Sequence, residues 1–252
     1  MLTASPLPPL DEAVRSSRHV PGEWFLAGVA QVVIPVVVTV TVALVLLTTP
    51  LPQDADTTQV YAITGALISA MFVRMSLGRL AEQHGSWRAA FGFTLPHVRD
   101  VPHVVGFLAV QLTARAALLT VLAAAAGPRF AIGYAGAVPV LSGRATLLML
   151  LGAVVVAPAM EEVAFRGVLL RGLMRRMSFW PSALASSAVF AGLHLAGVVR
   201  MADVPTVLVT VTVFGLLQCL LVRRTGRLGP AMAVHGTLNL VVTAFAVGAF
   251  SL

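Results

Sequence analysis

Long apolar runs alternate with short polar connections along the whole chain. An α-helix needs about 20 apolar residues to cross the hydrocarbon core of a bilayer. Runs of about this length, each with few charges, cover residues 25–49, 58–78, 103–126, 145–165, 180–197, 205–222 and 229–251. Proline and glycine mark most joints between the runs. The pattern predicts an all-α fold, a polytopic transmembrane helical bundle of about seven spans, with eight as the alternative count.

The first 24 residues are polar and rich in proline, unlike the rest of the chain. They contain no apolar core of the kind that a cleavable signal peptide carries. We therefore expect residues 1–24 to be a flexible or interfacial N-terminal tail and residues 25–252 to form a single transmembrane domain.

The composition excludes an ordinary soluble domain. Of the 252 residues, 58% are hydrophobic and 11% are charged, and the mean hydropathy is +0.92, whereas a soluble domain is about one-quarter charged. All 17 basic residues are arginine and lie mostly in short connections, so we expect membrane lipids and no nucleic acid as partners. One cysteine, Cys219, excludes an intrachain disulfide.

The arginines also predict an orientation. Three connections hold most of them: Arg79, Arg88 and Arg99, then Arg171, Arg175 and Arg176, then Arg223, Arg224 and Arg227. With seven spans, these connections lie on the same side as the N-terminus. Cytoplasmic loops carry the excess of basic residues, and the lysine-free, alanine-rich usage is typical of a bacterial genome rich in G and C. We therefore expect a multi-pass protein of the bacterial plasma membrane with a cytoplasmic N-terminus.

Ionisable side chains within the apolar runs indicate a functional centre. A charge in the middle of a span costs at least about 2.5–3.5 kcal/mol, so each needs a partner or a function. These residues are Arg115, Glu161, Glu162, His194 and His235.

The adjacent glutamates differ in the partners that they can reach. Glu162 and Arg166 are four residues apart and can pair on one helical face, whereas Glu161 points about 100° away from Glu162. Glu161 is thus left to act on a substrate. In the alternative interpretation, both glutamates belong to a structural ion-pair network with Arg115 and Arg166.

Each histidine has a helical neighbour four residues away. Phe190 can pack beside His194, and Asn239 shares a face with His235. A carboxylate and a neutral imidazole can deprotonate a water, while a second imidazole and a carboxamide donate hydrogen bonds to an oxyanion. His194 can equally be a hydrogen-bonded core residue.

Helix lengths constrain how these side chains meet. If residues 161–176 and 180–194 form an antiparallel hairpin, Glu161 and His194 lie at the same level, because both are about equally far from the turn. Straight spans do not bring His235 to that level. A break near Gly167 or Gly172, or a short, sunken helix in the run 180–197, would reconcile all three positions.

Three motifs in order resemble one protein family. EEVAFR (161–166) fits EExxxR, FAGLH (190–194) fits FxxxH and HGTLN (235–239) fits HxxxN. Together they resemble the CaaX-processing and bacteriocin-immunity (CPBP, or Abi) intramembrane glutamic endopeptidases, over about residues 145–245.

The resemblance implies an enzyme that needs no cofactor and cleaves a protein or peptide, with lipidated and membrane-embedded proteins as the candidate substrates. Prenyl-protein proteases are members of this family, but many bacterial members have no prenylated target, so the bacterial residue usage makes a CaaX substrate the less favoured one. Carried over by motif, Glu161 and His194 activate water, and His235 with Asn239 stabilises the oxyanion. Glu162, Arg166 and Phe190 occupy supporting positions. Arg115 lies outside the motifs. We expect it to balance a glutamate or to bind a substrate carboxylate, the alternative being an arginine that snorkels to water.

Three other functions remain open from the residues alone. One carboxylate and two imidazoles are a plausible zinc set, although HExxH is absent. Intramembrane Glu, His and Arg can also form the relay of a transporter. The third alternative is a non-catalytic membrane scaffold that keeps the site without using it.

Overall fold

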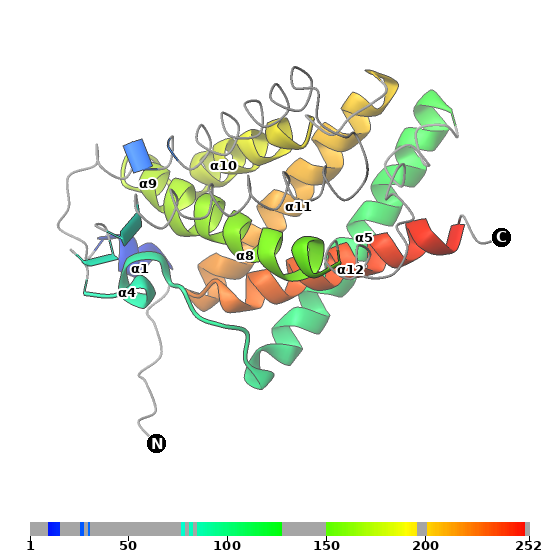
Figure 1. Cartoon of the computed structure of the whole chain (residues 1–252). Coiled ribbons are helices and arrows are strands. Elements are labelled where there is room, and N and C mark those ends of the chain that lie inside the picture. Colours follow the sequence, from blue (N-terminus) through cyan, green and yellow to red (C-terminus); the bar gives the residue numbers. More distant parts are fainter. Residues whose placement is uncertain are drawn as a thin grey trace, which may run out of the picture.

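The computed structural model describes residues 10–15, 26–27, 30, 77–78, 81–82, 85–127, 150–195 and 201–249. Every regular element within these residues is helical (Figure 1). The predicted all-α class is therefore confirmed for this part of the chain. Most of the predicted spans 25–49 and 58–78 lies outside the described residues, so the number of spans stays a prediction.

Among the described elements, two short helices precede the first long one. They are α1 (Leu10–Arg15) and α4 (Trp87–Phe91). Helix α4 begins where the hydroxyl of Ser86 accepts a hydrogen bond from the Ala89 N–H, and it ends at Gly92 with φ 68°. A 3-10 turn, η1 (Val98–Asp100), then leads directly into α5 (Val101–Ala126).

The glutamates lie in a stretch that stays helical from residue 150 to residue 174. It comprises η2 (Gly152–Val156), α8 (Ala157–Glu162), η3 (Val163–Leu169) and α9 (Leu170–Met174). Both η2 and η3 are π-helical, a widened geometry that is rare and frequently found at functional sites. The dihedral angles at each junction are right-handed helical. The proposed break near Gly167 or Gly172 is therefore wrong.

The remaining helices are α10 (Phe179–His194), α11 (Val204–Thr225) and α12 (Gly229–Ala249), with a short 3-10 turn, η5 (Met201–Asp203), before α11. Helix α10 has 16 residues, fewer than the roughly 20 that cross a bilayer. Of the two arrangements considered for His235, the short helix is the one that is present.

The packing of the helices brings α8, α11 and α12 together. Helix α10 returns antiparallel beside α9 and η3 and packs most extensively against α11, while α12 crosses α8, η2 and α5 (Figure 1). Small residues allow two of these approaches. A Cβ atom on Gly215 would lie 2.8 Å from the side chain of Ser187, and one on Gly236 would clash with the carbonyl oxygen of Val154.

Two of the described helices are long and apolar enough to cross a membrane. They are Val98–Ala125 and Val204–Thr225, which correspond to the predicted spans 103–126 and 205–222. Only 6% of the most apolar window in the first is buried within the protein. An apolar helix with so little protein cover suits contact with lipid.

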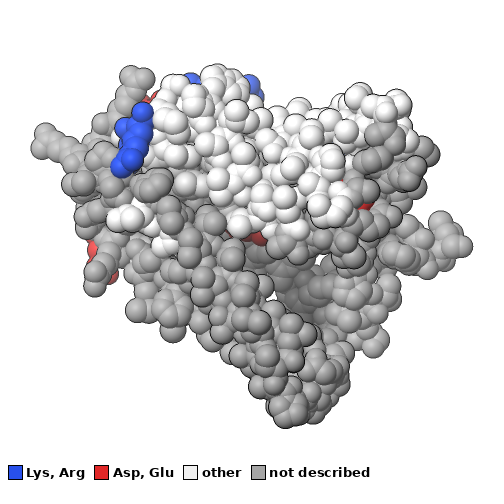
Figure 2. Space-filling model, turned by 90° about the horizontal axis from the view of Figure 1, so that it is seen from above, with Lys and Arg blue, Asp and Glu red and all other residues white. Residues whose placement is uncertain are grey.

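The arginine-bearing connections gather at one end of the bundle, as predicted. The Arg171 Nη2 atom donates to the carbonyl of Gly226 over 3.2 Å, and Arg227 pairs with Asp100. Figure 2 shows arginine side chains toward one end of the face in view, where most of the other described atoms belong to uncharged residues. The side of the membrane on which this end lies stays a prediction.

Part of the expected N-terminal tail packs against this same end. Leu10 in α1 is fully buried, and the Oδ2 atom of Asp11 lies 2.9 Å from the Nη2 atom of Arg223 at the end of α11. Residues 10–15 are therefore held against the helical domain.

Candidate active site

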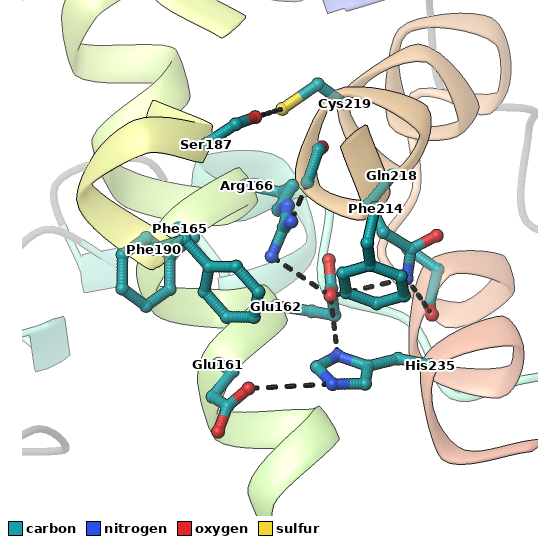
Figure 3. Close-up of polar contacts among 12 residues, drawn as sticks. Glu161, Glu162, Phe165, Arg166, Ser187, Phe190, Phe214, Gln218, Cys219 and His235 are labelled. Carbon is teal, nitrogen blue, oxygen red and sulfur yellow. Dashed lines mark hydrogen bonds and ion pairs between the residues drawn. The ribbon is translucent and has the colours of Figure 1, made fainter. Parts of the chain in front are cut away.

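The carboxylate of Glu162 is the centre of a buried polar cluster built from three helices (Figure 3). Its Oε1 atom accepts hydrogen bonds from Arg166 Nη1 at 3.1 Å, from His235 Nδ1 at 2.9 Å and from Gln218 Nε2 at 3.4 Å. Arg166 lies one turn further along the same helical stretch, Gln218 comes from α11 and His235 from α12. One oxygen atom therefore connects three separate segments of the chain.

Arg166 neutralises Glu162 without reaching solvent. The two side chains are 1% and 0% exposed, and the predicted pairing across one helical turn is confirmed. The guanidinium carbon lies 4.6 Å from the ring centroid of Phe190 and 5.9 Å from that of Phe214. Its Nη2 atom also donates to the carbonyl of Gly215 over 3.4 Å. Aromatic faces and a carbonyl thus replace the water that a buried arginine loses.

His235 lies between the two glutamates. Because a carboxylate only accepts hydrogen bonds, the 2.9 Å contact with Glu162 requires the ring proton on Nδ1. This tautomer directs Nε2 toward Glu161, whose Oε2 atom is 3.6 Å away (Figure 3). The side chain of Glu161 is 32% exposed, whereas that of His235 is 4% exposed. A buried imidazole therefore faces a carboxylate that small molecules can reach.

His194 ends α10 and packs on Phe190, as predicted, with 4.4 Å between the ring centroids. Its Nδ1 atom lies 2.9 Å from the carbonyl oxygen of Phe190, so that nitrogen carries a proton and Nε2 is directed elsewhere. Within the described residues, no hydrogen bond or ion pair joins His194 to Glu161. Their joint action on a water stays a prediction.

Phe190 and Phe214 form the aromatic wall of the cluster. The ring of Phe190 is 6.1 Å from that of His235, and the ring of Phe214 is 4.8 Å from it. Phe190 thus contacts both imidazoles, and the two histidines border one apolar surface.

Asn239 follows His235 by one turn of α12. Its Nδ2 atom donates to the carbonyl of Ala153 in η2 over 2.9 Å. A carboxamide has two N–H donors, so this contact with the backbone engages one of them.

Arg115 lies apart from the glutamates. It lines a small pocket between α5, α11 and α12, together with Gln111, Thr210 and Phe214. No ion pair between Arg115 and either glutamate is present among the described residues, and the expectation that Arg115 balances one of them stays a prediction. Its predicted contact with a substrate carboxylate stays a prediction.

Gln218 and Phe214 are the members of the cluster that the sequence motifs miss. Both lie in α11, which carries none of the three motifs. Gln218 is a fully buried carboxamide in an apolar helix. A strongly hydrogen-bonding side chain in such a place requires a partner, so this signal was present in the sequence beside the five ionisable positions.

Within the described part of the chain, no group of three or more His, Cys, Asp or Glu side chains is placed to hold a metal ion. The polar contacts of the cluster are instead those of carboxylates, imidazoles, a guanidinium and a carboxamide.

Comparison with known families gives one match. Residues 143–241 match the family described as type II CAAX prenyl endopeptidase Rce1-like. No curated protein and no solved structure matches the chain. The matched segment contains EEVAFR, FAGLH and HGTLN, and it also contains Gln218. Residues 143–241 therefore resemble an Rce1-like domain, the kind of domain that the CPBP family of CAAX endopeptidases carries.

Proposed function

We propose that this protein is a glutamate-dependent intramembrane endopeptidase with Glu161 as the base that activates water. The observation that carries the proposal is the row formed by Glu162, His235 and Glu161, in which a buried imidazole joins a buried carboxylate to a half-buried one. The match to a CAAX endopeptidase family supports peptide hydrolysis. We further propose that residues 25–252 are one transmembrane domain in the bacterial plasma membrane, with a cytoplasmic N-terminus.

Glu161 suits the role of base because no arginine pairs with it among the described residues. Its carboxylate can take a proton from a water as the oxygen attacks a peptide carbonyl. His194 donates from Nδ1 to the Phe190 carbonyl, so the lone pair of Nε2 in the neutral ring can accept a hydrogen bond from the same water. When the C–N bond breaks, the protonated Glu161 returns its proton to the leaving amine.

His235 and Asn239 suit the oxyanion. His235 donates from Nε2 only when both ring nitrogens carry protons, and Glu162 accepts the proton on Nδ1. Asn239 has a second N–H beyond the one that Ala153 accepts. Two donors directed at a developing oxyanion in an apolar site stabilise the transition state by several kcal/mol, about 3–4 for each donor.

The substrate class follows from the family. We propose a protein or peptide cleaved within or near the membrane, with prenylated proteins as the first candidates. Helix α10 has 16 residues, too few to span a bilayer, and we propose that water reaches the half-buried Glu161 past the end of this helix.

The test is cleavage of fluorogenic peptides, some prenylated, by purified protein in detergent. Glu161→Gln should lower kcat by at least about 100-fold, because it removes the base. Glu82→Gln, at an exposed glutamate, is the matched control and should cleave like the wild type. His194→Ala should also lose activity, and a chelator should change nothing.

Three outcomes would contradict this mechanism. Cleavage abolished by a chelator and restored by zinc would favour a metalloprotease. Full activity of Glu161→Gln would show that Glu161 is not the base. Ion flux in liposomes without cleavage of any peptide would favour a carrier.

A further inference from the structure

The side-chain amide of Gln218 contacts two groups that lie next to His235. Its Nε2 atom donates to Ala231 O over 2.8 Å and to Glu162 Oε1 over 3.4 Å. Ala231 lies four residues before His235, so its carbonyl is the one that an α-helix pairs with the backbone N–H of His235. A single amide group therefore contacts the helical turn that carries His235 and the carboxylate that holds its imidazole.

The orientation of the amide is determined by these contacts. A carboxamide nitrogen has two N–H donors, and its two neighbours, a carbonyl oxygen and a carboxylate oxygen, can only accept. Turning the group by 180° would place its oxygen against two acceptors. Gln218 is fully buried, so it has no water to exchange for these partners.

We propose that Gln218 is a positioning residue that sets the tautomer and the place of His235. Together with Arg166, it fixes the Oε1 atom of Glu162, which then accepts the Nδ1 proton of His235 and leaves Nε2 directed at Glu161. This proposal extends the proposed function to a residue outside the three motifs. It requires no contact between Gln218 and the substrate.

Gln218→Met tests the proposal because methionine has a similar length and no N–H. Glu162 Oε1 then retains two donors and the carbonyl of Ala231 retains its helical partner, so folding should be nearly unaffected. We expect kcat to fall by about 10- to 100-fold, as is usual when a group that orients a reactive side chain is removed. KM should stay within about twofold of the wild type, since Gln218 does not meet the substrate.

Gln111→Met is the matched control. Gln111 is also a buried glutamine, and its Nε2 atom donates over 3.3 Å to the carbonyl of Phe214 in the same helix as Gln218. It touches neither glutamate. It should change the melting temperature as much as Gln218→Met does and leave kcat unchanged. Because Gln111 lines the pocket that contains Arg115, any effect on substrate binding should appear in KM. An equal loss of kcat in both variants would mean that Gln218 acts through packing alone, and it would overturn the proposal.

A second measurement does not depend on activity. Nitrogen NMR of protein labelled with ¹⁵N-histidine reports which ring nitrogen carries the proton, and His235→Gln identifies the signal among the six histidines. At a pH at which His235 is neutral, the wild type and Gln111→Met should show its ring proton on Nδ1, and Gln218→Met should show a mixture of tautomers.

The two measurements separate the proposals. An unchanged tautomer in Gln218→Met overturns the role of Gln218, whatever the enzyme does. Loss of the tautomer in a protein that hydrolyses no peptide supports the positioning role and contradicts the proposed activity. If Gln218→Met does not fold, Gln218→Leu also removes the amide donor without adding a charge and is read in the same two ways.

Discussion

Removing the positive partner of Glu162 should lower the free energy of unfolding more than any surface substitution does. The Arg166→Met variant keeps much of the apolar stem but leaves a fully buried carboxylate without its cation. At the 3.1 Å separation of Nη1 and Oε1, the direct attraction is about 5 kcal/mol for an effective dielectric constant of about 20. Broken buried pairs lose about 3–5 kcal/mol, because one charge remains uncompensated. We expect the free energy of unfolding to fall by that amount.

The measurement is reversible unfolding in mixed micelles, followed by the fluorescence of the tryptophans. Arg99→Met, at an exposed arginine, is the control and should change the stability by less than about 0.5 kcal/mol. The double variant Glu162→Gln, Arg166→Met carries neither charge. It should be more stable than Arg166→Met alone by at least about 1 kcal/mol.

Two results would contradict the expected role of the buried ion pair. If Arg166→Met is no less stable than Arg99→Met, the buried ion pair contributes nothing and Glu162 does not depend on Arg166. If the double variant is less stable than both single variants, the carboxylate stabilises the fold by contacts other than charge.

Two further predictions concern packing and the surface. Gly236→Ala forces a methyl group against the Val154 carbonyl and should cost about 1–3 kcal/mol of stability. Gly192→Ala, with open space at its Cβ position, is the control, and equal stability of the two variants would contradict the close approach. Asp11→Asn removes an ion pair with Arg223 in which both side chains are more than one-third exposed, so its effect should stay below about 1 kcal/mol and vanish in high salt; a larger loss would mean that α1 depends on this pair.

Hydropathy predicted the long apolar helices, and charge predicted which connections lie together. The apolar runs 103–126 and 205–222 correspond to α5 and α11 within a few residues. The arginine-bearing connections share one end of the bundle. The π-helical segments η2 and η3 were not predictable, because the apolar pattern of the sequence does not distinguish a π-helical turn from an α-helical one.

The pairing of Glu162 with Arg166 was predictable because both residues lie on one helical face. Contacts between different helices were not. His235 meets both glutamates although straight spans of full length would have kept it away, and α10 is shorter than a full span. Gln218 was not predicted, because only charged and imidazole side chains served as indicators of a buried site. A buried carboxamide needs hydrogen-bond partners for the same reason.

The ion pair at the centre of the site also bears on how the chain enters the membrane during synthesis. The partners of Glu162 on α11 and α12 are 56 and 73 residues away, so they leave the ribosome only after the segment that contains Glu162. Arg166 is the exception, because it lies one turn away and is made almost at once. The segment therefore carries its own counter-ion into the bilayer, which lowers the cost of inserting an isolated acidic residue. Helices α11 and α12, which are made later, then add their hydrogen bonds to a Glu162–Arg166 pair that has already formed.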